Sequence, residues 1–251
     1  MKRLFVVGCS FTQYYWPTWA DILAQEYDYF ENWAQPGLGN RAILERLTEI
    51  VVHNNITADD TIIVQWTDFH RYDIHHRNAL RINFPDRTDG WNAHGTIFDN
   101  PKYTNDWIQD NWKEFSYMLH TYNYIKLGTC LLESLPCKWY VTFMNDLIGP
   151  MDFYEDLSAY KSVFPTEKML PPINDFCKFY NKHIMDGVED PHPTPIAHYD
   201  YVRTYLAPNL DKSWAQKAED LLVNLTLSNQ AKSVFEKELD WDLYKYYHKG
   251  L

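Results

Sequence analysis

The sequence TIIVQW, from Thr61 to Trp66, is the clearest β-strand pattern in this chain of 251 residues. Its β-branched and aromatic side chains form a run that is too short for a helix and typical of a buried strand. Short apolar runs at residues 4–7 and 138–143, and an aromatic run at residues 27–33, predict three more strands. Between them, apolar residues recur with helical spacing, most regularly over residues 43–51. This alternation predicts a parallel sheet with crossover helices.

Capping signals place the expected helices. Asn40 precedes the periodic segment, and we expect it to cap that helix. A shorter helix is expected after Pro17, and a late helix after Thr194 as cap, with Pro195 at its first position. Residues 107–135 predict one long helix or two.

Composition divides the chain into a core region and two additions. Residues 1–208 carry the strands and helices of one α/β domain, within which residues 70–105 are polar and poor in apolar periodicity. We expect this stretch to be a solvated insertion over the carboxyl ends of the strands, where α/β proteins place their ligand sites. Residues 209–251 predict a charged, helical C-terminal extension, either a packed appendage or a surface for a protein partner.

Charge and cysteine usage exclude several classes of protein. A formal net charge of −11 disfavours nucleic-acid binding, which needs a basic surface, and no apolar run is long enough to span a membrane. The first residues lack a signal-peptide core, which predicts a cytoplasmic protein as synthesised. The four cysteines show no paired spacing, so we expect neither a zinc site nor a disulfide. Aromatic residues make up 17% of the chain, which fits either an aromatic core or a recognition surface.

Three separated segments carry the residues of a candidate hydrolytic site. In VVGCSFT, Ser10 follows the first predicted strand after a small-residue turn. Asp190 and His192 flank Pro191, so one short loop presents both, and a carboxylate beside a histidine is the arrangement that activates a serine. Gly37 and Asn40 follow the second strand, where backbone and amide N–H groups could bind an oxyanion. An ordinary strand-to-helix turn is the alternative interpretation of Ser10.

The order of these segments resembles the SGNH (GDSL-like) hydrolases. VVGCSFT is similar to the first block of that family, with Cys9 in place of Asp, NWAQPGLGN (residues 32–40) to the second, and DPHPTPIAH (residues 190–198) to the last. The resemblance implies a flavodoxin-like three-layer α/β/α fold, a Ser10–His192–Asp190 triad, Gly37 in the oxyanion hole, and no metal or cofactor. QWT after the third strand resembles proteins of tailed bacteriophages, which implies a viral, virion-associated setting.

Two positions depart from the family pattern. The third block normally ends in an Asn that donates to the oxyanion, whereas this chain has Thr67 there, so the Thr67 hydroxyl and the Asn40 amide are the candidate replacements. Many members place the acid three residues before the histidine, a position that Glu189 occupies here. We prefer Asp190 and keep Glu189 as the alternative.

Other reactive residues have simpler interpretations. Cys9 is expected to be a small buried thiol, because adjacent side chains on an extended strand point to opposite faces and Ser10 is the candidate nucleophile. The spacing of His70, Asp73, His75 and His76 matches no closed metal site, and a solvated insertion is favoured. Arg71 either orients an anionic substrate or pairs with Asp68. His198 and Asp200 are assigned to the late helix.

These features favour a serine esterase that removes a short acyl group from a carbohydrate or a similar ester. The alternative is a catalytically weakened binding or structural protein on the same fold, part of a larger assembly such as a phage virion, with the C-terminal extension as a partner surface. A nucleotide-binding protein is disfavoured, because the first turn lacks the glycines and the lysine of a P-loop.

Overall fold

The computed structural model describes residues 1–75, 91–92, 95–177, 183–185, 188–225 and 228–241. Its main sheet has four parallel strands in the order β2-β1-β3-β6. The strands are β1 (Arg3–Val7), β2 (Tyr29–Asn32), β3 (Thr61–Trp66) and β6 (Lys138–Phe143), with two-stranded pairs β4 (Ile74–His75) with β5 (Trp91–Asn92) and β7 (His183–Met185) with β8 (Val188–Asp190). The prediction of an α/β fold with a parallel sheet is confirmed.

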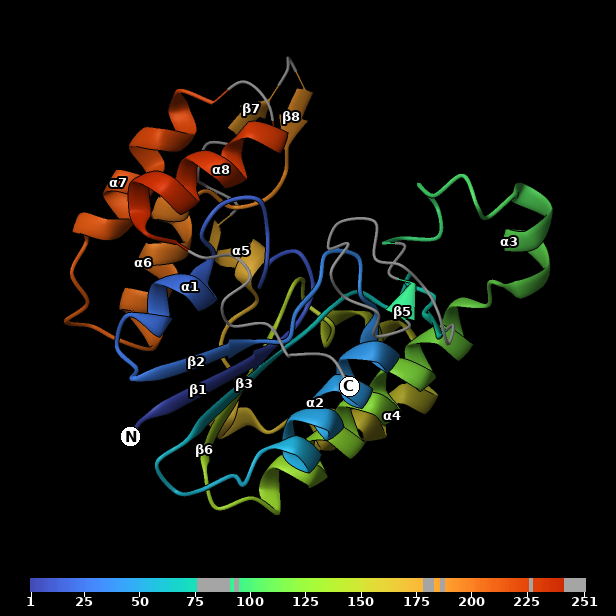
Figure 1. The fold of residues 1–251 in the computed structure, drawn as a ribbon. Helices are drawn as coiled ribbons and strands as arrows, with labels where there is room; N and C mark the ends of the chain where they lie inside the picture. Colours follow the sequence, from blue (N-terminus) through green and yellow to red (C-terminus); the bar gives the residue numbers. More distant parts are fainter. Residues whose placement is uncertain (76–90, 93–94, 178–182, 186–187, 226–227, 242–251) are drawn as a thin grey trace.

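Helices cover both faces of the sheet (Figure 1). The α-helices are α1 (Trp19–Ala24), α2 (Asn40–His53), α3 (Asn105–Asn111), α4 (Glu114–Glu133), α5 (Ile173–Cys177), α6 (Pro195–Tyr205), α7 (Ser213–Val223) and α8 (Ser228–Leu239). Three 3-10 helices, η1 (Gly149–Phe153), η2 (Glu155–Val163) and η3 (Thr166–Lys168), follow β6. The segment over residues 107–135 is therefore two helices, which meet at Trp112 and Lys113.

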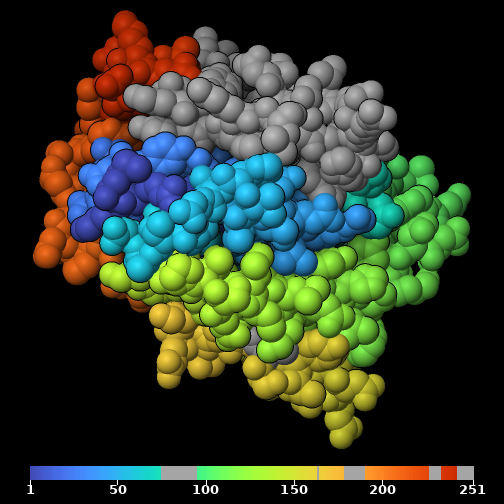
Figure 2. All heavy atoms as spheres, turned by 60° about the horizontal axis from the view of Figure 1, so that its bottom comes forward, coloured from blue at the N-terminus to red at the C-terminus, as the bar shows by residue number. Residues whose placement is uncertain are grey.

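Alternation along each strand divides the core between the two faces. Phe5 and Val7 of β1 pack toward α2 and α4, whereas Leu4 and Val6 pack toward α1 and α6. Figure 2 shows α2 and α4 lying side by side across the first of these faces. Large aromatic side chains such as Trp19, Trp66 and Tyr122 are fully buried in these clusters, so the core of the described part is rich in aromatic residues, and an aromatic recognition surface stays a prediction.

The cap of α2 differs from the prediction in two ways: Asn40 is not the cap, and Asp73 of the insertion is buried against the helix instead of being solvated. The N-cap of α2 is Gly39, with Asn40 as the first helical residue, and Asp73 supplies the capping carboxylate instead. Its oxygens accept from the N–H groups of Gly39 at 2.7 Å and Ala42 at 3.0 Å, and the side chain is only 7% exposed. A carboxylate at a helix N-terminus satisfies orphan donors and the helix dipole, so Asp73 is structural and not solvated.

The described part of the C-terminal extension is packed. Phe235 and Leu239 of α8 and Leu222 of α7 form a third cluster with Trp16, on the loop between β1 and α1. No helix in the described ranges is long and apolar enough to cross a membrane. His76 and the rest of residues 76–90 lie outside the described part, as does the side chain of His75.

Candidate active site

Ser10 lies in a tight turn immediately after β1. The carbonyl oxygen of Cys9 accepts from the N–H groups of Thr12 at 3.0 Å and Gln13 at 3.1 Å, which closes the turn around Ser10. Ser10 is 7% exposed, and Cys9, fully buried, is the small thiol expected from the sequence. The turn therefore places a serine hydroxyl at the carboxyl edge of the sheet, in the position expected of a nucleophile.

A buried glutamine from the next strand holds this turn. Gln65, near the end of β3, accepts through Oε1 from the hydroxyl of Thr12 at 2.5 Å and from the N–H of Cys9 at 3.4 Å. A Cβ at Gly8 would lie 2.3 Å from Thr12 Oγ1 and 2.8 Å from Gln65 Oε1. Glycine is required at position 8 because the turn folds back onto its backbone.

Asp190 and His192 form a contact pair at the end of β8. His192 Nδ1 lies 2.7 Å from Asp190 Oδ1, and the same oxygen accepts from the backbone N–H of His192 at 2.9 Å. The backbone N–H and the ring Nδ1 of His192 thus both contact the same carboxylate oxygen. Because a carboxylate accepts hydrogen bonds, the proton of the neutral imidazole is on Nδ1. The lone pair of Nε2 is then free to act as a base. Of the two candidate acids, Asp190 is the one with a described contact to the histidine, since the side chain of Glu189 lies outside the described part.

Aromatic residues from the Ser10 loop contact this pair. Tyr14 donates to Asp190 Oδ2 at 2.6 Å, and its ring stacks on the His192 ring with centroids 3.8 Å apart. The ring of Phe11, next to Ser10 in the chain, lies 5.2 Å from that of His192. The fold therefore brings the first and last candidate segments together, although no hydrogen bond joins Ser10 to His192 within the described residues. Catalytic contacts of this kind often tighten only when substrate binds.

The ionisation states of this pair follow from its surroundings. Burial raises the pKa of Asp190, but hydrogen bonds from His192 and Tyr14 outweigh burial, and the net pKa lies below its ordinary value. Burial, together with the bond to Asp190, raises the pKa of the Tyr14 phenol far above its ordinary value. Asp190 is thus a carboxylate and Tyr14 a neutral donor at neutral pH.

The C-terminal extension braces the segment that carries His192. Trp16 donates from Nε1 to the carbonyl of Pro193 at 2.8 Å, within the cluster that α7 and α8 cover. Glu219 of α7 accepts from the N–H of Ile196 at 3.0 Å, so it caps the first turn of α6. These bonds fix the start of α6, three residues beyond His192.

Gly37 lies in the loop between β2 and α2 with a φ of 84°, a left-handed conformation that favours glycine. Arg46, 1% exposed, braces the same loop by donating to the carbonyl of Trp33 at 2.6 Å and to Gln35 Oε1 at 2.9 Å. Within the described residues no group accepts a hydrogen bond from the Gly37 N–H, so that donor is available to an oxyanion.

Asn40 and Thr67 contact each other. The Asn40 amide donates to the Thr67 carbonyl at 2.8 Å and accepts from the Thr67 N–H at 2.8 Å. Both ends of the amide are therefore occupied in tying the start of α2 to the end of β3. The Thr67 side chain is fully buried, with its hydroxyl 3.7 Å from the sulfur of Met144.

Arg71 does not pair with Asp68, which overturns one of its two interpretations. Asp68 instead accepts from the Asn145 amide at 2.9 Å through both carboxylate oxygens. Arg71 donates to the carbonyl of Leu38 at 2.8 Å and lies 3.4 Å from Met144 Sδ. Its charge thus reaches the carboxyl edge of the sheet.

The described residues contain no group of His, Cys, Asp and Glu side chains that could hold a metal ion. His198 lies on α6, as expected, and is 1% exposed. Burial, and to a smaller extent the charge of His192, lowers the pKa of His198 to about 3, so it is neutral at physiological pH.

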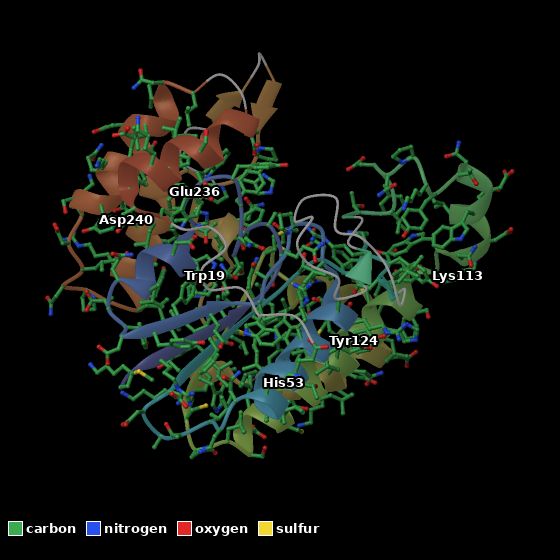
Figure 3. All side chains as sticks on the ribbon, in the orientation of Figure 1. Trp19, His53, Lys113, Tyr124, Glu236 and Asp240 are labelled. Carbon is green, nitrogen blue, oxygen red and sulfur yellow. The ribbon has the colours of Figure 1, made fainter. Side chains whose placement is uncertain are left out.

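A cavity of about 350 Å³ opens between the start of α2, α4 and the insertion. Its walls combine hydrogen-bonding groups such as Asn111 and Ser116 with the rings of Tyr72, Tyr117 and Tyr124. Tyr124, labelled in Figure 3, belongs to α4 beside α2. Asn40, three residues after Gly37, and Arg71 also line this space, whereas Ser10, Gly37 and His192 do not.

Sequence patterns did not indicate three of the residues that organise the site. Tyr14 binds Asp190, which is 176 residues away in the chain. Gln65 binds partners 53 and 56 residues away, and Asp73 binds partners 31 and 34 residues away. Gln65 carried one signal, because a polar residue inside an otherwise apolar buried strand needs a partner. Nothing local marked Tyr14, and Asp73 was considered only as a metal ligand, not as a helix cap.

Several solved structures are similar to this chain. They include that of TesA (13% identity, 82% of this chain and 99% of that chain, TM-score 0.44). A lipolytic protein of the G-D-S-L family from Veillonella parvula gives 14% identity, 82% and 98% coverage and a TM-score of 0.44. The psychrotrophic esterase EstA from Pseudoalteromonas sp., in a structure inhibited by monoethylphosphonate, gives 11% identity, 82% and 99% coverage and a TM-score of 0.42. No protein-family model and no curated protein sequence matches the chain.

Proposed function

We propose that this protein is a serine esterase of the SGNH type that acts without a cofactor. The observation that carries the proposal is the Asp190–His192 contact at 2.7 Å, with the His192 ring held against the aromatic residues that follow Ser10. A serine, an oriented imidazole and a carboxylate are the components of an activated nucleophile.

In the first half-reaction, Ser10 Oγ attacks the acyl carbonyl while His192 Nε2 takes the hydroxyl proton. Asp190 holds the Nδ1–H and stabilises the positive charge that forms on the ring. When the tetrahedral intermediate collapses, His192 returns the proton to the leaving alcohol and the acyl group remains on Ser10. In the second half-reaction a water molecule repeats the attack, releasing the carboxylic acid and restoring the Ser10 hydroxyl.

The developing oxyanion is bound by the N–H groups of Ser10 and Gly37. Beside these donors, the two hydrogen bonds between Asn40 and Thr67 hold the start of α2 against the end of β3. Preorganised donors of this kind contribute on the order of 10²–10³ each to the rate.

A short acyl ester of a carbohydrate is the proposed substrate. Tyrosine rings and hydrogen-bonding side chains line the cavity at the start of α2, a composition that suits the apolar faces and hydroxyl groups of a sugar. Synthetic esters of increasing acyl length test this: the rate is expected to fall beyond a few carbons, and a steady rise would contradict it.

A catalytically weakened binding or structural protein is the second candidate, with the C-terminal extension as its partner surface. It is favoured by one observation: Thr67 stands where the family has a donating Asn, and the Asn40 amide is already occupied.

A fluorophosphonate probe separates the two candidates without a known substrate. Attack by an activated serine on phosphorus expels fluoride and leaves a covalent adduct that mass spectrometry maps to one residue. We expect an adduct at Ser10 that is absent from Ser10→Ala and His192→Ala. Folded wild-type protein without an adduct would instead favour the binding role, and light scattering would then show whether it assembles.

A further inference from the structure

We propose that the Arg71 guanidinium supplies the oxyanion donor that the third block lacks. The inference rests on the esterase function proposed above and assigns a catalytic role to a residue outside the three sequence blocks. In this role Arg71 donates N–H bonds to the carbonyl oxygen of the substrate as negative charge develops on it.

Two contacts define the placement of Arg71 at this edge of the sheet. Its Nη1 donates to the Leu38 carbonyl at 2.8 Å, one residue after Gly37. Its Nη2 lies 3.4 Å from Met144 Sδ, and that sulfur is also 3.8 Å from Cys9 Sγ, next to Ser10. The guanidinium therefore contacts the Gly37 loop directly and the turn that carries Ser10 through the Met144 sulfur.

The same sulfur connects Arg71 to the position of the missing amide. Thr67 Oγ1 lies 3.7 Å from Met144 Sδ, so the Thr67 side chain and the guanidinium contact one common atom. An Asn side chain at position 67 would direct its amide into this region. Thr67 is shorter, and the adjacent charged donor compensates for the lost N–H.

No carboxylate within the described residues forms a hydrogen bond or an ion pair with Arg71, although the charge of Asp73 interacts with it at longer range. Asp68 is bound by Asn145, and Asp73 by the backbone of α2. A guanidinium has five N–H donors, of which the contacts above use two, so donors remain for a ligand. Unused N–H donors on a cation can bind an anion that forms beside them, and the tetrahedral intermediate is such an anion.

The test combines removal of the guanidinium with restoration of the amide. Arg71→Met, Thr67→Asn and the double variant are compared with wild type, using the rate of fluorophosphonate labelling at Ser10 and the kcat and KM for p-nitrophenyl acetate. Arg203→Met, at an exposed position on α6, is the matched control. Unfolding curves verify that each variant is folded.

We expect Arg71→Met to lower kcat by about 10²–10³ with KM changed less than about threefold, because the lost interaction exists only in the transition state. Thr67→Asn should recover at least about tenfold in the Arg71→Met background. Arg203→Met should behave as wild type.

Three outcomes would overturn the inference. Wild-type rates in folded Arg71→Met would remove any catalytic role. A loss confined to KM, or seen with p-nitrophenyl succinate but not with the uncharged acetate, would mean that Arg71 recognises an anionic substrate. A loss that Thr67→Asn does not recover would make Arg71 a brace for the Gly37 loop. In each case wild-type labelling at Ser10 keeps the esterase function, whereas a wild type that does not label overturns both proposals.

Discussion

Replacing Asp190 by Asn should slow Ser10 chemistry far less than replacing it by Ala. Two N–H groups of His192 converge on Oδ1, whereas the Tyr14 hydroxyl donates to Oδ2. An asparagine can direct its carbonyl toward His192 and its NH₂ toward the Tyr14 oxygen. The imidazole keeps its tautomer and orientation, and the variant loses only the negative charge.

The magnitude follows from that single lost charge. At an effective dielectric constant of about 20, a carboxylate and an imidazolium about 4 Å apart attract each other by about 4 kcal/mol, which corresponds to about 10³ in rate. The two side chains are 16% and 18% exposed, so solvent screening lowers this upper bound. We expect Asp190→Asn to be about 10²–10³-fold slower than wild type. Asp190→Ala also loses the orientation and should be about 10⁴-fold slower.

The assay is the second-order rate of fluorophosphonate labelling at Ser10, measured at pH 7. Glu189→Gln is the matched control, since it neutralises the adjacent carboxylate, and it should label at the wild-type rate. Asp190→Asn at the wild-type rate would refute the reasoning, as would a larger loss in Glu189→Gln than in Asp190→Asn.

Three further predictions test the surroundings of the site. Tyr14→Phe removes one charge-assisted bond and should slow Ser10 labelling about tenfold with little change in KM for p-nitrophenyl acetate. Gly8→Ala introduces a Cβ 2.3 Å from Thr12 Oγ1 and should lower the free energy of unfolding by about 1–3 kcal/mol in denaturant titrations. The folded-state pKa of His198, about 3, lies below its ordinary value of 6.5, so its contribution to stability is present above pH 6.5 and is lost as pH falls. Between pH 6.5 and 4 wild-type stability should therefore fall by up to about 1.4 kcal/mol per unit more than that of His198→Leu, and equal slopes would contradict the assignment.

The sequence alone determined the elements whose signals are local. The apolar run at Thr61–Trp66 and the periodic pattern after Asn40 predicted β3 and α2, and alternation of strands and helices predicted the parallel sheet. Asp190 and His192 are two residues apart, so a single loop could be expected to present both. These inferences needed only propensity, periodicity and short-range geometry.

Only the tertiary structure decided which side chains meet at the carboxyl edge. Asn40 was expected to cap α2, but Asp73 reaches its N-terminus from the insertion, and the Asn40 amide binds β3. Tyr14 meets Asp190 across 176 residues, a pairing that no local pattern encodes. The sequence left two interpretations of Arg71, and only its hydrogen bond to the Leu38 carbonyl places it at the Gly37 loop. The physical reason is the same in each case: a buried polar group takes whatever partner the packed elements bring within hydrogen-bond distance, and sequence spacing does not fix that partner.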